Sequence, residues 1–350
     1  MSVCVNTASH VSGCQYSVTC QSISVLHSNQ FACATCFSLG IVLNVINTVV
    51  LRDKRLKESS YTYLAALAVA DSCSLLMFGL NGVGRGHFPD HYGWQVFQVF
   101  VYFPVCLSST STSVFLIVTV TLERFLFLYR PLAARICCNR RMARRVVVAI
   151  TLFSVVINVP RFFVFRITPA GDMQRTWFGN SIFYKTLTWL FFLLVAVGCG
   201  LVLIVINALL INGIQRVNDR RQMLTRSADA CGGGKAGEKS QERRLTRTLV
   251  SVTVLYLVGE LPSCIFSRLV FTAILGPNNA HVTGAYWYLV AEWLATVCAV
   301  SQHSLNFVFY CIFNKRFYQV FRIKCLTCSK TPTCREHSEL ASIAPPAVTQ

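Results

Sequence analysis

Charged residues are scarce in this sequence. They make up 13% of its 350 residues, and only 14 are acidic, whereas charged residues are about 25% of a soluble domain. A mean hydropathy of +0.52 is too high for a soluble surface. The net charge of +18 is compatible with nucleic-acid binding, but the basic residues lie in short stretches between apolar segments. No nucleic-acid partner is therefore predicted.

Other features are absent as well. Residues 1–30 contain no Lys or Arg, so the basic start of a cleavable signal peptide is missing, and the first apolar segment is expected to act as its own insertion signal. The chain shows no internal repeat and no Asn-x-Ser/Thr sequon. Its 17 cysteines are spread along its whole length, so no single disulfide framework follows from them.

Long apolar runs are abundant. A bilayer core about 30 Å thick is crossed by about 20 apolar residues of helix, and backbone groups in lipid must be satisfied within the segment. The sequence therefore predicts an all-α membrane protein, with a seven-transmembrane helix bundle within residues 31–312. The third run is longer than a straight span needs, so it is expected to tilt. The predicted spans are 31–51, 61–82, 95–128, 145–165, 182–211, 246–275 and 285–312.

The segments outside the spans differ in composition. Residues 1–30 are predicted to be an extracellular N-terminal segment. Residues 212–247, which are charged and contain three consecutive glycines, predict a flexible linker. Residues 313–325 combine Phe and Val with Lys and Arg, which predicts a short amphipathic eighth helix on the inner leaflet. Residues 326–350 predict a disordered cytoplasmic tail.

The distribution of basic residues predicts the orientation. Stretches 52–60, 129–145, 212–247 and 313–350 hold 25 of the 32 Lys and Arg, whereas the opposite side holds 6. Such an excess in short loops marks the cytoplasmic side. We therefore predict a multi-pass plasma-membrane protein whose N-terminus lies outside and whose C-terminus lies in the cytoplasm.

Four acidic residues fall inside the predicted spans: Asp71, Glu123, Glu260 and Glu292. A charged side chain at the centre of a membrane helix costs about 2.5–3.5 kcal/mol or more, so each is a candidate functional residue. Asp71 is either a buried polar anchor or an ion or switch site. Arg124, next to Glu123, is either a cation whose apolar stem lets it reach the interface or a latch that pairs with a second acid.

The polar residues of the spans resemble the motifs of one family, the rhodopsin-like G-protein-coupled receptors. The resemblance covers about residues 31–325. Two parts of it, Phe115–Arg135 and Asn306–Phe317, are most similar to invertebrate FMRFamide-type neuropeptide receptors, and Phe307 replaces the proline of the seventh-helix motif. The matching segments are Gly40-Ile-Val-Leu-Asn44, Leu67-Ala-Val-Ala-Asp71, Glu123-Arg124-Phe125 and Asn306-Phe-Val-Phe-Tyr310.

The resemblance implies a switch at the inner end of the bundle. In the family, the motif Arg is held by an acid at the base of the sixth helix, which is Glu242 in this sequence. Arg124, with its neighbour Glu123, is expected to pair with Glu242 at rest. Its release is expected to open a groove for a heterotrimeric G protein, with Asn306 and Tyr310 as further parts of the switch.

The resemblance also implies an ion pocket. In the family, an Asp, a Ser and an Asn from the second, third and seventh helices surround a sodium ion. Asp71, Ser113 and Asn306 occupy these positions. No other cofactor and no metal site are predicted.

Several family features are missing. The helix-three Cys that is tethered to the second outer loop should fall at Val99, and residues 166–181 contain no Cys either. That disulfide, typically worth about 2–4 kcal/mol, cannot form, so a looser outer loop is expected. Glu260 stands where the sixth helix of the family carries a Trp, and Cys199 stands near the usual fifth-helix Pro.

The outer half of the bundle narrows the class of ligand. Amine receptors of the family carry an Asp where this chain has Cys106, and light receptors need a Lys that residues 285–312 lack. Glu260 and Glu292 suit a cationic, aromatic extracellular ligand, such as a peptide that ends in Arg-Phe-amide. Alternatively, Glu260 is protonated or bonded within the bundle, and the aromatic residues mark the membrane interface. Those residues are Tyr102, Trp189, Tyr288 and Trp293.

Cys325 and Cys328 follow the predicted eighth helix. Their Cys-x-x-Cys spacing is compatible with a zinc or redox site, but the further ligands of such a site are lacking. Cysteines beside basic residues at the membrane favour palmitoylation, so lipidation is the preferred prediction.

The sequence as a whole predicts a receptor that transduces an extracellular ligand, a neuropeptide by resemblance, to a G protein. A divergent receptor for a non-peptide ligand is the first alternative. A transporter is the second, but repeats and paired broken helices are missing. The spans contain no nucleophile–base pair, metal cluster or phosphate loop, so no enzymatic activity is predicted.

Overall fold

The computed structural model describes residues 37–87, 91–168, 173–227, 236–267, 270–271, 282 and 285–326. Within these ranges, the side chains of 85–86, 217–249 and 325–326 lie outside the description. The predicted extracellular segment 1–30 and nearly all of the predicted tail 326–350 also lie outside the described residues.

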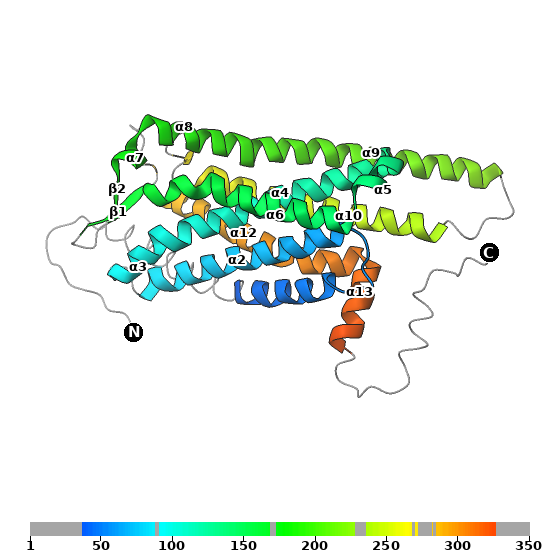
Figure 1. The fold of residues 1–350 in the computed structure, drawn as a ribbon, viewed down its shortest axis with the longest axis horizontal. Coiled ribbons are helices and arrows are strands. Elements are labelled where there is room, and N and C mark those ends of the chain that lie inside the picture. Colours follow the sequence, from blue (N-terminus) through cyan, green and yellow to red (C-terminus); the bar gives the residue numbers. More distant parts are fainter. Residues whose placement is uncertain are drawn as a thin grey trace.

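The long helical segments of the described chain lie side by side along the long axis of the molecule, as Figure 1 shows. The architecture is the all-α bundle that the sequence predicts. The segments are Phe37–Leu51; α2 (Ser60–His87); α3 (Tyr92–Phe97) with α4 (Phe103–Tyr129); α6 (Arg140–Asn158); α8 (Ile182–Phe191) with α9 (Cys199–Ser227); α10 (Ala236–Phe266); and α12 (Tyr286–Phe313).

The bundle has the dimensions of a membrane protein. Among the described residues, five helical segments are long and apolar enough to cross a bilayer, and Phe37–Leu51 and Val250–Phe266 are shorter apolar helices. The outer face of α6 is apolar, with exposed Val148, Leu152 and Phe153. Conversely, the centre holds fully buried polar residues. This inside-out distribution is stable when lipid, not water, surrounds the bundle.

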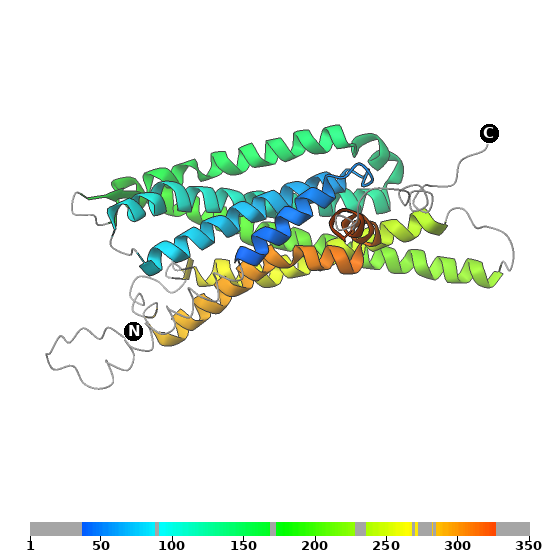
Figure 2. The same ribbon diagram turned by 90° about the horizontal axis from the view of Figure 1, so that it is seen from below.

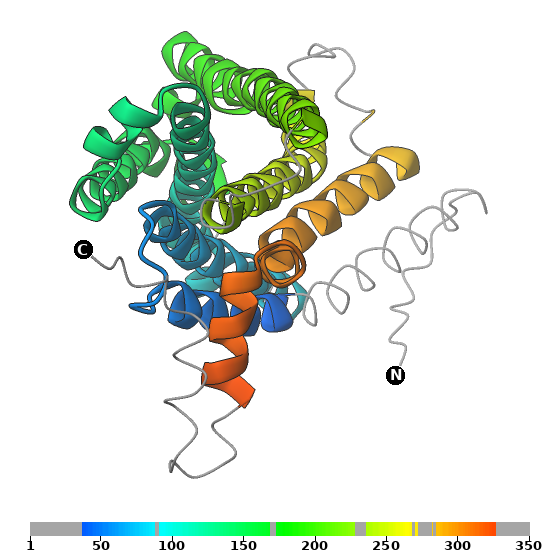
Figure 3. The same ribbon diagram turned by 90° about the vertical axis from the view of Figure 1, so that its right-hand side faces the viewer.

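Helix α4 is the central element. It contacts α2, α6, α9 and α10, and the end-on view in Figure 3 shows it between the green α6 and the yellow-green α10. Its buried face combines apolar residues such as Val114 and Ile117 with Ser111 and Ser113. Small polar side chains at such contacts let membrane helices approach closely and hydrogen-bond across the interface.

Outer and inner denote the two ends of the bundle as the loop charges predict them. The third and fifth spans each contain a wide turn in their outer part. A π-helical segment, η1 (Gln98–Tyr102), joins α3 to α4, and a second one, η3 (Phe192–Gly198), joins α8 to α9. Such turns interrupt the regular α-helical hydrogen bonds and are frequent at functional sites. The hydropathy of these segments does not distinguish them from ordinary helix.

The fifth and sixth spans continue far beyond the membrane-length segments that the sequence predicts. α9 extends to Ser227 and α10 begins at Ala236, so the prediction of a flexible linker is wrong for 212–227 and 236–247, whereas 228–235 lie outside the described residues. Figure 2 shows both helices extending past the rest of the bundle. The apolar runs end at the membrane surface, but Lys, Arg, Glu and Gln are good helix formers in water. The helices can therefore continue beyond the membrane.

A short hairpin covers part of the outer end. Strands β1 (Phe165–Ile167) and β2 (Met173–Arg175) pair antiparallel, with Phe165 opposite Arg175. The short helix α7 (Trp177–Asn180) follows, capped by the Thr176 side chain. The hairpin lies between the fourth and fifth spans, at the predicted second outer loop.

At the inner end, α13 (Lys315–Phe321) turns away from the bundle axis, as Figure 1 shows. Asn314 fixes the turn, because its Oδ1 accepts from the backbone N–H of Phe317 at 3.1 Å and its Nδ2 donates to the Tyr61 hydroxyl at 3.2 Å. Phe317 and Val320 are buried. A side-chain cap and two buried apolar residues therefore hold this short helix against the bundle.

Candidate functional site

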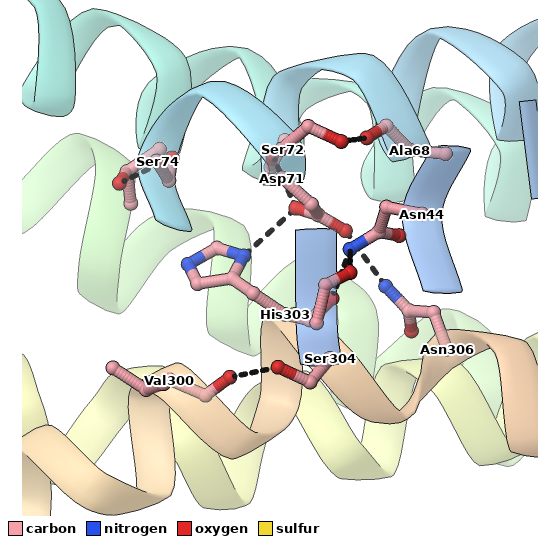
Figure 4. Close-up of polar contacts among 12 residues, drawn as sticks. Asn44, Ala68, Asp71, Ser72, Ser74, Val300, His303, Ser304 and Asn306 are labelled. Carbon is pink, nitrogen blue, oxygen red and sulfur yellow. Dashed lines mark hydrogen bonds and ion pairs between the residues drawn. The ribbon is translucent and has the colours of Figure 1, made fainter. Parts of the chain in front are cut away.

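Asp71 on α2 is the centre of a buried polar cluster, drawn in Figure 4. Its side chain is fully buried. Oδ1 accepts a hydrogen bond from Ser113 Oγ at 2.8 Å and lies 2.8 Å from His303 Nδ1, and Oδ2 accepts from Asn306 Nδ2 at 2.8 Å. The structure thus brings together the three residues assigned to the ion pocket and adds His303 as a fourth.

The first helix fixes the position of His303 on α12. Asn44 Nδ2 donates to the backbone carbonyl of His303 at 2.8 Å and to that of Gly40 at 3.0 Å. A side chain at Gly40 would collide with Ser304, so this glycine permits the close approach of the two helices. The imidazole also lies beside Phe78 of α2, with 6.5 Å between ring centroids. Both the backbone and the ring of His303 are therefore held.

The sequence analysis does not identify His303. It lies three residues before Asn306, so one helical turn places both side chains on the same face of α12. Asn306 is expected to face Asp71, so a polar residue one turn before it, His303, is expected to face Asp71 as well.

At the inner end of α4, Arg124 pairs with an acid of the first inner loop. Arg124 is only 4% exposed, and its Nη2 donates to Glu58 Oε2 at 3.1 Å and also to the Ser60 hydroxyl. The neighbouring Glu123 accepts from the Ser59 hydroxyl. The segment that leads into α2 therefore binds both charged residues of the third-helix motif.

The predicted partner of Arg124 is Glu242. The backbone of α10 passes through this position, but the side chain of Glu242 lies outside the described residues, so that pairing stays a prediction. Among the described residues, Glu58 is the acid that forms an ion pair with Arg124. The sequence analysis does not identify Glu58, because it lies in a loop whose conformation cannot be derived from hydropathy.

Tyr310 and Phe307 connect the seventh span to α13. Tyr310 is 1% exposed, and its ring centroid lies 5.5 Å from that of Phe317. Phe307, which replaces the motif proline, packs edge-on against Phe317 and Phe321. The Tyr310 hydroxyl has no hydrogen-bond partner among the described residues, so it can change position without breaking a protein hydrogen bond.

Glu260 lies at a tight contact between α10 and α12. A side chain at the preceding Gly259 would meet the Gln302 side chain and the Cys298 carbonyl, which explains why glycine is suited to this position. Glu260 is 9% exposed, and its Oε1 accepts a weak hydrogen bond from Cys264 Sγ at 3.8 Å. The acid that replaces the family Trp is therefore inside the bundle.

The other residues assigned to ligand binding lie on the outer parts of the third and seventh spans. Cys106 is 5% exposed, and Tyr102 meets Phe78 edge-on with 6.5 Å between ring centroids. Glu292 and Trp293 are half-buried on α12. The Trp293 indole N–H is buried and has no hydrogen-bond partner in the described part of the chain.

Comparison with known proteins identifies the family. Residues 44–301 match the model of the 7 transmembrane receptor (rhodopsin family). The chain belongs to this family. The assignment agrees with the cluster around Asp71 and with the buried third-helix Arg124.

The receptor is similar to several named relatives. The FMRFamide receptor of Drosophila melanogaster is 26% identical over 301 residues, which cover 81% of this chain and 51% of that protein. The FMRFamide peptide receptor frpr-18 of Caenorhabditis elegans is 24% identical, with 69% and 55% covered. The somatostatin receptor type 5 of Bos taurus is 26% identical, with 79% and 70% covered. The chain spans about half the length of the two FMRFamide receptors.

The outer hairpin of the receptor is held without the usual disulfide. Val99 takes the place of the helix-three Cys, and the cysteines whose side chains are described are free. Instead, Phe165 stacks on Phe103 with 6.0 Å between ring centroids. Thr176 donates from its backbone N–H to the Val164 carbonyl at 2.9 Å. Ring packing therefore attaches this loop to the third span, and the backbone hydrogen bond joins its second strand to the end of the fourth span.

An ion pair attaches the end of the eighth helix to the first inner loop. Lys324 Nζ lies 3.0 Å from Asp53 Oδ2, and the backbone N–H of Arg55 donates to Asp53 Oδ1 at 2.9 Å. Burial raises the pKa of Asp53, but the Arg55 hydrogen bond and the Lys324 charge outweigh it. The pKa of Asp53 therefore lies below its ordinary value.

Asp53→Asn is expected to loosen α13 at neutral pH. A partly exposed pair is worth at most about 1 kcal/mol, so amide hydrogen exchange in Lys315–Phe321 should accelerate by up to about fivefold. Because folding lowers the pKa of Asp53, the stabilisation is present above the ordinary aspartate range and is lost as the pH falls below about 4. Wild type and variant should differ at neutral pH and converge in acid. Equal exchange rates at neutral pH would contradict this role.

The remaining site predictions concern the end of the described chain. Cys328 and the side chain of Cys325, the predicted lipidation sites, lie outside the described residues. In the described part of the chain, no group of three or more His, Cys, Asp or Glu side chains is arranged to hold a metal ion.

Proposed function

We propose that this receptor lies in the plasma membrane with its N-terminus outside, responds to an extracellular peptide and activates a heterotrimeric G protein at its inner face. The observation that carries the proposal is the pairing of buried Arg124 with Glu58, 3.1 Å apart. A buried cation held by a partly exposed acid has two arrangements, paired and released. A ligand that favours the released arrangement shifts the population towards it.

The proposal of a peptide ligand rests on the relatives and on the outer acids. Two similar proteins are named as FMRFamide receptors, and a third as a somatostatin receptor. Glu260 is buried and Glu292 is half-buried. A carboxylate in such surroundings binds an arginine side chain through two parallel, charge-assisted hydrogen bonds. A peptide that ends in Arg-Phe-amide offers both this cation and an aromatic ring.

The test is a screen of cells that express the full chain against a neuropeptide library, with GTP loading of a G protein as the signal. The proposal expects GTP loading in response to a peptide that carries Arg near its C-terminus. GTP loading by non-peptide ligands alone would favour a divergent receptor. Substrate flux into vesicles without GTP loading would favour a transporter.

Glu58→Ala is expected to raise ligand-independent GTP loading about three- to tenfold, because weakening the hold on Arg124 by about 0.7–1.4 kcal/mol shifts the resting population by that factor. Glu58→Gln keeps a hydrogen-bond acceptor but loses the charge, so a smaller rise is expected. Glu242→Ala is the matched comparison. A rise in Glu242→Ala together with an unchanged Glu58→Ala would assign the latch to the sixth helix.

A further inference from the structure

The oxygen atoms of the Asp71 site already have donors. Oδ1 receives the Ser113 hydroxyl and faces His303 Nδ1, each at 2.8 Å, and Oδ2 receives the amide of Asn306 at 2.8 Å. A carboxylate oxygen only accepts hydrogen bonds, so Nδ1 of His303 must carry a hydrogen in either charge state of the ring. The positive end of an N–H bond therefore points at Oδ1.

This arrangement does not fit the sodium ion that the family implies. Hard cations prefer oxygen ligands such as carboxylates, carbonyls and water. At Oδ1, a ring nitrogen with its hydrogen takes the side on which a cation would bind, and Figure 4 shows the imidazole aimed at Asp71. Asn44 holds the His303 backbone and Phe78 lies beside the ring, so both favour the position of the imidazole at Asp71. The residues present therefore oppose a metal ion at this carboxylate.

The second nitrogen of the ring is differently placed. His303 Nε2 is buried and has no hydrogen-bond partner among the described residues. The polar contact of the ring is therefore made through Nδ1, which is directed at Asp71.

The surroundings of His303 are acidic on two sides. Asp71 from α2 and Glu260 from α10 are the acids whose charges act on it. From α4 comes the hydroxyl of Ser113, and from the first helix the amide of Asn44. Further titratable groups are the Tyr310 hydroxyl on its own helix, the Tyr256 hydroxyl on α10 and the Cys106 thiol on α4. Among the described residues, His303 is the basic residue that pairs with Asp71.

We infer that His303 takes the place of the metal ion of this site, so that sodium does not bind at Asp71. The ring is attached to α12, and its hydrogen bond to Asp71 links that helix to α2. The inference does not depend on the proposed ligand or on G-protein coupling.

Thermal unfolding of the purified full chain in lipid nanodiscs tests the inference. Wild type is expected to unfold at the same temperature in sodium chloride as in choline chloride of equal concentration. His303→Ser supplies a hydroxyl in place of the ring. This variant should gain a sodium-specific rise of about 2–4 °C.

A sodium-specific stabilisation of the wild type, or equal unfolding temperatures of His303→Ser in the two salts, would overturn the inference. The comparison of sodium chloride with choline chloride needs only the wild-type chain, so it tests the inference even if the His303→Ser variant fails to fold. Because no ligand or G protein enters the measurement, its failure is distinct from a failure of the proposed function.

Discussion

An Asp71→Ala receptor is expected to unfold well below the wild-type temperature. The substitution leaves Ser113, His303 and Asn306 as buried donors without their shared acceptor. Removing one partner of a buried charge pair costs about 3–5 kcal/mol. At about 2–4 °C per kcal/mol this corresponds to roughly 6–20 °C in the unfolding midpoint. Differential scanning fluorimetry of the purified chain measures it.

Two further variants test whether the fall in unfolding temperature arises from the unpaired His303. Asp71→Asn retains the side-chain volume and one acceptor oxygen, so its loss should be smaller. Asp71→Ala combined with His303→Ala removes both charged partners and should recover part of the loss, because coupled residues are not additive. If the double variant is as unstable as the two single losses combined, the charge pair contributes nothing beyond packing.

Potency of an Arg-Phe-amide peptide is expected to fall by at least about 30-fold in Glu292→Ala, because truncating one partner of a buried, hydrogen-bonded charge pair costs about 2–5 kcal/mol. Glu292 is half-buried on the outer part of α12. Tyr286→Ala, at the exposed start of the same helix, is the control and should keep near wild-type potency. Peptide-dependent GTP loading measures both.

A charge exchange separates direct contact from a structural effect. Glu292→Arg should respond poorly to the Arg-Phe-amide peptide and better to a peptide in which Glu replaces that Arg. Equal potency of the original peptide at wild type and Glu292→Ala would show that Glu292 does not contact the ligand.

Hydropathy and loop charge were sufficient to predict the bundle, because lipid requires every span to be an apolar helix long enough to cross the bilayer. They do not locate the ends of α9 and α10, since a helix does not need an apolar environment to continue. The same limit applies to the wide turns η1 and η3. They follow from packing against neighbouring helices, which a hydropathy pattern does not record.

The candidate site was predictable where a motif names the residue. Asp71, Ser113 and Asn306 meet in the structure as the resemblance implies. No motif names His303 or Glu58: His303 is indicated only by its spacing of three residues from Asn306, and Glu58 lies in a loop whose conformation hydropathy does not predict. Their roles depend on the partners that folding brings to them, Asp71 for one and Arg124 for the other.

The wide turns η1 and η3 have a consequence for how receptors of this kind diverge. Each lies in the outer part of its span, and η1 separates the outer end of the third span from Ser113 of the Asp71 cluster. One residue corresponds to about 100° of rotation in an α-helix, and a π-turn absorbs one residue within a single turn. An insertion or deletion there rotates the ligand-facing end and leaves the inner residues in place. Evolution can thus change what such a receptor detects by single-residue steps without rebuilding its response.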